Sequence, residues 1–203
     1  MTALDQRDVF ATAADHLVDL VGRIGADQWD RPGLGAWTIR ALVGHTGRAL
    51  TTVADYIDKP AETCRIADAA DYYLTAAAEA DAESVRRRGE QAGAALGEDP
   101  VSVLAGERDR ALAAIARVDN PIVTTVVGGM RLLDYLPSRT CELAVHGLDI
   151  ARALGVEEPA LPRDVTEVAS TVLAAVAARR GDGVTTLLAL TGRTALPDGF
   201  TVV

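Results

Sequence analysis

Two histidines and a glutamate carry the residue types and the spacing that suit metal chemistry in this chain. Glu142 and His146 lie four residues apart, and His45 lies in a separate, earlier segment. On a helix, side chains four residues apart share one face. Two imidazoles and a carboxylate suit a divalent transition metal with open coordination positions, where a bound thiol would lose its proton and become a nucleophile. We therefore interpret His45, Glu142 and His146 as ligands of a metal that activates a thiol.

The same residues also have ordinary structural explanations. A glutamate and a histidine one turn apart often form only a surface hydrogen bond, and a single histidine beside a core face is often only packed there. On a helical wheel, however, His45 lies about 110° from the centre of the apolar stripe of its helix. Its neighbours on that face, Ala41, Ala49 and Thr52, are small. We expect this face to have room for a ligand from a neighbouring helix.

The helices that must position these residues are predicted by apolar residues at spacings of three and four. Thr38 is a good N-cap for the helix that carries His45. Asp134 is a candidate N-cap for the helix that carries Glu142, called the motif helix below, and Pro137 would lie in its first turn. The predicted helices cover residues 4–24, 39–57, 62–96 with a break near 89–97, 100–118, 134–154, 165–179 and 184–190.

One short run in the chain is β-like. Residues 122–127 are rich in branched side chains, which favour a strand. Gly128 and Gly129 predict a turn, after which residues 130–132 could pair back as a hairpin. We therefore expect an all-α fold with a short β-like hairpin before the motif helix, made of a helical bundle over residues 1–155 and a short helical extension over 156–203 packed on it.

The composition limits the classes of partner. The chain has 203 residues and a formal net charge of -9, which argues against a nucleic-acid surface and against an anionic membrane surface. Its apolar stretches are shorter than the roughly 20 residues that span a bilayer. Cys64 and Cys141 lie in no CxxC motif, and the N-terminus lacks the pattern of a signal peptide. We expect a protein of the reducing cytoplasm.

Three segments resemble a known family. The segment from Trp37 to His45 closely resembles the W-[ST]-x-x-x-L-x-x-H segment of the mycothiol-dependent maleylpyruvate isomerase family, within the wider DinB-like superfamily. The segment from Arg139 to Asp149 resembles the R-x-x-E-x-x-x-H-x-x-D helix of that family. Residues 187–200 are similar to the close of many actinobacterial members.

The resemblance implies a four-helix bundle of the DinB/YfiT type that holds a divalent metal, commonly zinc, on His45, Glu142 and His146. It also implies mycothiol, a low-molecular-weight thiol of actinobacteria, as the cosubstrate. In the isomerase the metal-bound thiol adds to an activated double bond, and relatives are thiol S-transferases. In the isomerase a second, C-terminal domain contributes an arginine to the site, and residues 156–203 are shorter than such a domain. We therefore expect a small electrophile other than maleylpyruvate.

Several alternatives stay open at the level of sequence. The bundle could be a binding or regulatory module with a structural or vestigial metal, or a metal-dependent hydrolase that needs no thiol. Nickel, iron and manganese suit the ligand set as well as zinc does, and a homodimer is an open alternative to a monomer. Asp149 could orient a metal ligand or simply lie on the helix surface. Arg139 could hold a carboxylate of the substrate or pair with Glu142, whereas Cys141 is expected to be a packing residue.

Overall fold

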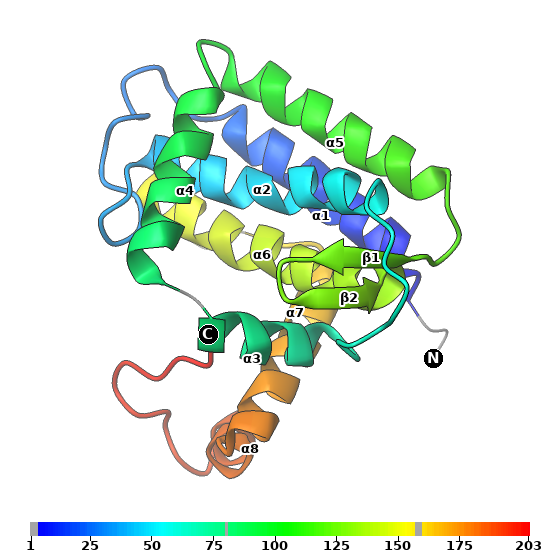
Figure 1. The fold of residues 1–203 in the computed structure, drawn as a ribbon. Coiled ribbons are helices and arrows are strands. Elements are labelled where there is room, and N and C mark those ends of the chain that lie inside the picture. The colour runs from blue at the N-terminus through cyan, green and yellow to red at the C-terminus, as the bar shows by residue number, and fades with distance from the viewer. Residues whose placement is uncertain (1–3, 80, 157–159) are drawn as a thin grey trace.

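The computed structural model of the chain describes residues 4–79, 81–156 and 160–203 and is mostly helical. The central bundle consists of α1 (Gln6–Val21), α2 (Ile39–Ile57), α5 (Pro100–Ala116) and α6 (Leu132–Ala153). Contacts between these helices run from α1 to α6, to α2, to α5 and back to α1 (Figure 1). The predicted all-α class with a small hairpin is confirmed.

Aliphatic side chains fill the centre of this bundle. Because aromatic residues make up only 4% of the chain, leucine, valine and alanine supply most of the buried surface. Each large side chain that is fully buried stabilises the fold by roughly 1.5–3 kcal/mol. The buried side chains of the four helices include Phe10, Leu17, Leu42, Leu50, Leu104, Leu136 and Leu143.

The two helices that carry the candidate ligands begin differently. Thr38 caps α2 as predicted, since its hydroxyl accepts a hydrogen bond from the backbone N–H of Ala41. The prediction that Asp134 caps α6 is wrong, because α6 already begins at Leu132. The side chain of Asn120, in the preceding loop, accepts a hydrogen bond from the N–H of Leu133 and caps the helix from outside. Pro137 consequently lies inside α6, beyond its first turn.

The hairpin precedes α6 as predicted, but its turn lies earlier. Strands β1 (Ile122–Thr125) and β2 (Gly128–Arg131) are antiparallel, with Thr125 opposite Gly128, so Val126 and Val127 form the turn. Gly128 and Gly129 were predicted to be the turn and instead begin β2. Gly129 is needed there because a Cβ atom would lie 2.0 Å from the carbonyl oxygen of Thr63.

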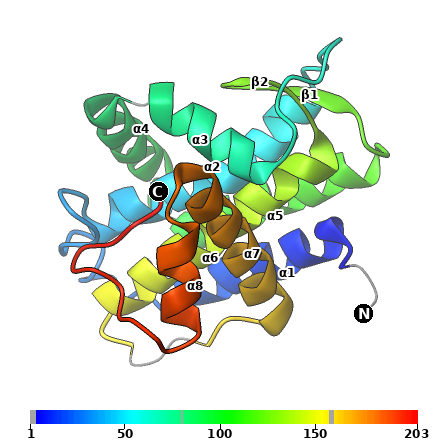
Figure 2. The ribbon, with the colours of Figure 1, turned by 90° about the horizontal axis from the view of Figure 1, so that it is seen from below.

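The alanine-rich middle of the chain forms two helices, α3 (Ala69–Glu79) and α4 (Ala82–Ala95). The prediction of helix for much of residues 62–96 is confirmed over α3 and α4, but residues 62–68 are not helical. The predicted break near 89–97 is misplaced, because residues 89–95 are helical and the two helices are instead separated between Glu79 and Ala82. α4 packs against α2, and α3 packs against α6 and α7. These two helices therefore cover the side of the bundle on which α2 and α6 meet (Figures 1 and 2).

The C-terminal part of the chain adds α7 (Arg163–Arg180) and α8 (Gly183–Leu190). Gly181 ends α7 with a positive φ of 98°. α7 packs against α6, α3 and α1, whereas α8 contacts α7 and extends away from the bundle (Figure 1). In the parts of the chain that the structure describes, no helix is long and apolar enough to cross a bilayer.

Candidate metal centre

Two contacts fix the register between α2 and α6. The Tyr135 hydroxyl of α6 donates a hydrogen bond of 3.0 Å to the Thr52 hydroxyl of α2. Seven residues away on each helix, in opposite directions along the two chains, His45 faces Glu142. Seven residues are about two helical turns, so the two contacts lie on the same pair of faces and the helices run antiparallel. This register brings together the two segments that the sequence analysis singled out.

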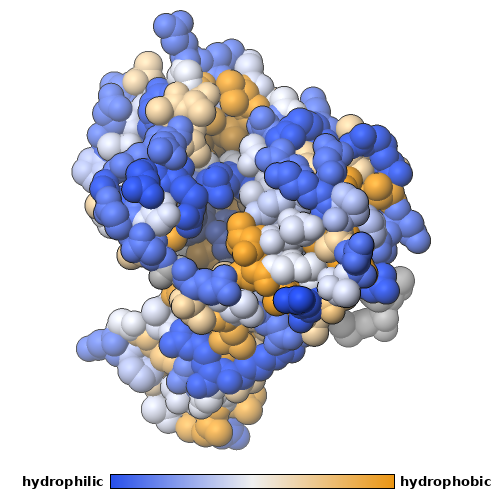
Figure 3. All heavy atoms as spheres, viewed as in Figure 1, coloured by the Kyte–Doolittle hydropathy of each residue, from blue (hydrophilic) through white to orange (hydrophobic). Residues whose placement is uncertain are grey.

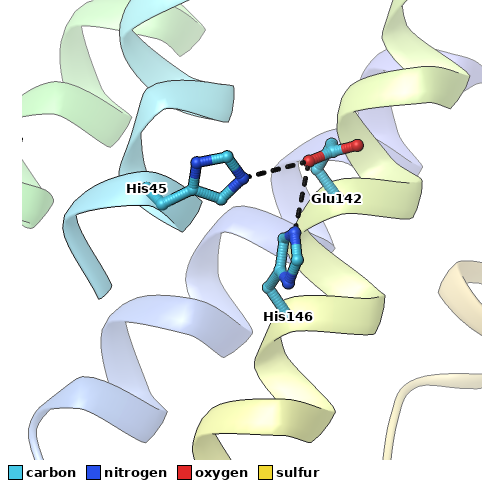
Figure 4. Close-up of side chains that lie close together, drawn as sticks. All are labelled: His45, Glu142 and His146. Carbon is cyan, nitrogen blue, oxygen red and sulfur yellow. Dashed lines mark ion pairs between the residues drawn. The ribbon is translucent and has the colours of Figure 1, made fainter. Parts of the chain in front are cut away.

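His45, Glu142 and His146 converge on one point between the two helices (Figure 4). Glu142 Oε2 lies 3.9 Å from Nε2 of His45 and 3.5 Å from Nε2 of His146. The three potential ligand atoms lie within 4.8 Å of one another. Among the described residues, no other histidine, cysteine or acidic side chain joins this group.

The separations in this group suit a shared cation better than direct hydrogen bonds. Distances of 3.5 and 3.9 Å are longer than an ordinary N–H···O hydrogen bond. Ligand atoms about 2.0–2.1 Å from a tetrahedral zinc ion lie roughly 3.3–3.4 Å from one another. The distance from the carboxylate oxygen to each nitrogen is therefore close to the spacing of two ligands on one ion, and the donor set fits a divalent transition metal.

Each of two outer contacts fixes one of these ligands from behind. Asp149 Oδ2 lies 3.1 Å from Nδ1 of His146, which leaves Nε2 of that ring to face the centre. The Tyr73 hydroxyl of α3 donates a hydrogen bond of 2.7 Å to Glu142 Oε1. Nδ1 of His45, by contrast, is buried and has no hydrogen-bond partner in the described parts of the chain.

Comparison with known proteins assigns the chain to a family. The model of the mycothiol maleylpyruvate isomerase N-terminal domain matches residues 10–151, which include all three candidate ligands and end before α7. The chain belongs to this family. Neither the comparison with curated proteins nor the comparison with solved structures found a match. The resemblance stated from the Trp37 and Arg139 segments is thus confirmed.

The three candidate ligands of this family member differ in protonation. Burial and the neighbouring His146 lower the pKa of His45 to about 4, so His45 is neutral at pH 7. Burial opposes the charged form of His146, but the Asp149 and Glu142 carboxylates outweigh it and raise the pKa of His146 to about 9. Burial likewise opposes ionisation of Glu142, but His146 and Arg139 hold the pKa of Glu142 well below its usual range. Without a metal, the centre therefore contains one carboxylate and one imidazolium.

Helix α4 holds the region around His45 in place through Trp37 and through the close contact of Gly44 in α2 with Gly93 in α4. The Trp37 ring lies 4.5 Å from the His45 ring, centroid to centroid, and its Nε1–H donates to the Arg86 carbonyl of α4. A Cβ atom on Gly44 would lie 2.1 Å from the backbone nitrogen of Gly93. The α2 and α4 backbones thus touch beside His45. This crossing was not predicted, although the four-residue spacing of Gly89 and Gly93 in α4 is a sequence signal for it.

The centre lies in the wall of a cavity of about 530 Å³. α2, α3, α4, the hairpin turn and α6 all contribute to its lining. Figure 3 shows the corresponding hollow on the face between α4, α3 and the hairpin. The cavity gives the candidate ligands access to a small molecule while the rest of α2 and α6 stays packed.

Arginine side chains dominate the charge of this cavity. Arg48, Arg88 and Arg139 line it, against the two acidic residues Glu79 and Glu142. Arg139 is only 8% exposed, and its guanidinium carbon lies 4.9 and 5.0 Å from the ring centroids of Tyr72 and Tyr135. In the described parts of the chain Arg139 forms no ion pair within 4.0 Å, so the suggested pair with Glu142 is not formed.

Two further residues of types that can bind a metal, Cys141 and His16, do not belong to the group of potential ligands. Cys141 is buried in the core, as expected for a packing residue, and burial raises the pKa of its thiol to about 11. His16 lies on α1 and is not part of the group of potential ligands. Tyr73 also contacts the centre, through its hydrogen bond to Glu142. This contact could not be predicted from the sequence, because the alanine-rich segment around Tyr73 carries no motif.

Proposed function

We propose that the protein is a metal-dependent enzyme that activates a low-molecular-weight thiol, with mycothiol as the cosubstrate and transfer or isomerisation of a small electrophile as the reaction. The convergence of His45, Glu142 and His146 in a cavity wall carries this proposal. Membership of the mycothiol maleylpyruvate isomerase family supports the choice of thiol. Zinc is the metal we propose, and nickel, iron and manganese also suit the ligands.

The residues of this centre suit a divalent ion to which a thiol could bind and lose its proton. A divalent ion bound there would lower the pKa of a thiol that binds to it. His45 is neutral and offers its lone pair directly, and Glu142 is ionised. Asp149 orients His146, and Trp37 covers one face of the His45 ring. The group of three has no fourth protein ligand among the described residues, as expected of a catalytic site and not of a closed structural one.

The arginines of the cavity favour an electrophile that carries negative charge. Arg48 and Arg88 approach the cavity from α2 and α4, and Arg139 from α6, next to Glu142. A guanidinium binds a carboxylate with two parallel hydrogen bonds, and this interaction is strongest where water is excluded. We therefore propose a carboxylate-bearing electrophile. A panel of electrophiles that differ only in a carboxylate tests this: the acids should have the lower KM, and equal KM values would contradict it.

The experiment for the proposed function is a thiol titration of the metal-loaded protein, followed by turnover with and without thiol. Mycothiol should bind to the loaded protein and not to the metal-free protein, and turnover should require the thiol. Turnover without any thiol would favour the metal-dependent hydrolase. Stoichiometric metal without thiol binding or turnover would favour a binding or regulatory module.

A further inference from the structure

The two oxygens of the Glu142 carboxylate have different partners. Oε2 faces Nε2 of His45 and of His146, whereas Oε1 accepts a hydrogen bond of 2.7 Å from the Tyr73 hydroxyl. The same hydroxyl lies 3.1 Å from the Ser138 carbonyl oxygen. Because a phenol has one proton, the shorter bond to the charged acceptor is the stronger of the two. The hydrogen bond therefore holds the carboxylate at Oε1, while Oε2 faces the two histidines.

Helix α3 holds the Tyr73 hydroxyl at this point. The Asp68 carboxylate caps the start of α3 by accepting hydrogen bonds from the N–H groups of Ala70 and Asp71. Arg179 of α7 donates to the same carboxylate at 2.6 and 2.7 Å. Tyr72 packs edge-on against the Tyr73 ring and lies beside α6. The phenol thus reaches Glu142 from a helix that α7 and α6 both hold in place.

We propose that Tyr73 is a positioning residue that keeps Glu142 a ligand through one oxygen only. This inference rests on the proposed function, in which the centre holds a divalent ion. A carboxylate without a partner on its second oxygen can bind an ion through both oxygens and fill one more coordination position. The hydrogen bond from Tyr73 occupies Oε1 and so preserves that position for the thiol or the electrophile.

The test replaces Tyr73 by phenylalanine, which keeps the ring and removes the hydroxyl. In cobalt-substituted Tyr73→Phe, the visible absorption should be weaker than in the wild type, because a second carboxylate oxygen raises the coordination number. The metal dissociation constant should also change, since loss of an outer hydrogen bond to a ligand typically alters metal affinity about 10–100-fold. Tyr56→Phe is the matched control, because Tyr56 lines the same cavity and no hydrogen bond from its hydroxyl is found among the described residues. It should match the wild type in both measurements.

An infrared measurement on the wild-type protein gives an answer that does not depend on the variant's folding. The splitting between the two carboxylate stretching bands of Glu142, identified by their loss in Glu142→Gln, should be large in the zinc-loaded wild type, as for a carboxylate that binds through one oxygen. A small splitting, or a cobalt spectrum that is the same in Tyr73→Phe and in the wild type, would overturn the role of Tyr73. A wild-type protein that binds no metal would overturn the proposed function, and the inference with it.

Discussion

Asp149 Oδ2 lies 3.1 Å from Nδ1 of His146, one turn further along α6. Both side chains are mostly shielded from solvent, so this contact is stronger than a surface pair would be. It turns Nε2 of His146 toward His45 and Glu142, and it would keep the remaining proton on Nδ1 when Nε2 binds a metal. Among the residues that the structure describes, none supports the second nitrogen of His45 in this way. The two histidines therefore differ in how firmly they are held, although they face the same carboxylate oxygen.

Replacing Asp149 by asparagine should weaken the hold of His146 on a metal. The amide can still accept a hydrogen bond but carries no charge, so the ring is oriented less firmly. We expect the loaded variant to release its metal to a chelator about 10–100-fold faster than the wild type. Asp198→Asn, in the exposed tail, serves as the control and should release metal at the wild-type rate. Equal rates for all three proteins would mean that Asp149 is only a surface residue of α6.

Metal binding should release about one proton per chain at pH 7. His146 has a pKa raised to about 9 and so binds a proton at pH 7, whereas His45, with a pKa lowered to about 4, and Glu142 do not. A metal must displace the proton of His146, so affinity should increase with pH and level off above about pH 9. Calorimetry in buffers of different ionisation enthalpy measures the proton count. Binding without proton release would contradict this account of His146, and Asp149→Asn should release fewer protons at pH 7 because its His146 pKa is lower.

Gly44→Ala should destabilise the fold and disturb the centre together. A Cβ atom at this position would overlap the backbone of α4, 2.1 Å from the nitrogen of Gly93. Because backbone and not a flexible side chain must move, we expect a loss of about 3 kcal/mol or more in the free energy of unfolding, together with weaker metal binding through His45. Denaturant unfolding of the metal-free protein measures the loss.

Gly106→Ala is the matched control for this substitution. Gly106 lies inside helix α5, and a Cβ atom there would meet no other group within 4 Å. Alanine should stabilise that helix by about 0.5–1 kcal/mol and leave metal binding unchanged. A Gly44→Ala protein as stable as the Gly106→Ala protein would refute the close crossing of α2 and α4.

Local sequence signals predicted the helices that carry the centre, because these signals act within one helix. Thr38 capped α2 as expected, and the spacing of Glu142 and His146 placed both on one face of α6. The wheel position of His45 indicated room for a neighbour, and α6 occupies that room. The expected ligands therefore came together once two predicted helices packed side by side.

Features that depend on distant contacts could not be predicted in the same way. Asn120, outside the helix, caps α6 and moves its start to Leu132. Tyr73 reaches Glu142 only because α3 crosses α6, and no spacing relates residues so far apart in the chain. Gly129 lies inside β2 and not in the hairpin turn, and its lack of a side chain accommodates the carbonyl of the distant Thr63. These features depend on tertiary contacts, which cannot be predicted from the secondary-structure propensities of neighbouring residues.

Metal content measured per chain tests the central claim most directly. The account predicts about one divalent ion per chain in the wild-type protein, loss of that ion in His45→Ala, and full metal content in the control His16→Gln, whose histidine lies on α1 outside the group. Mass spectrometry of the intact folded proteins, with elemental analysis, gives the counts. A wild-type protein without stoichiometric metal, or a His45→Ala protein that keeps the wild-type content, would contradict the assignment of His45, Glu142 and His146 as a metal centre.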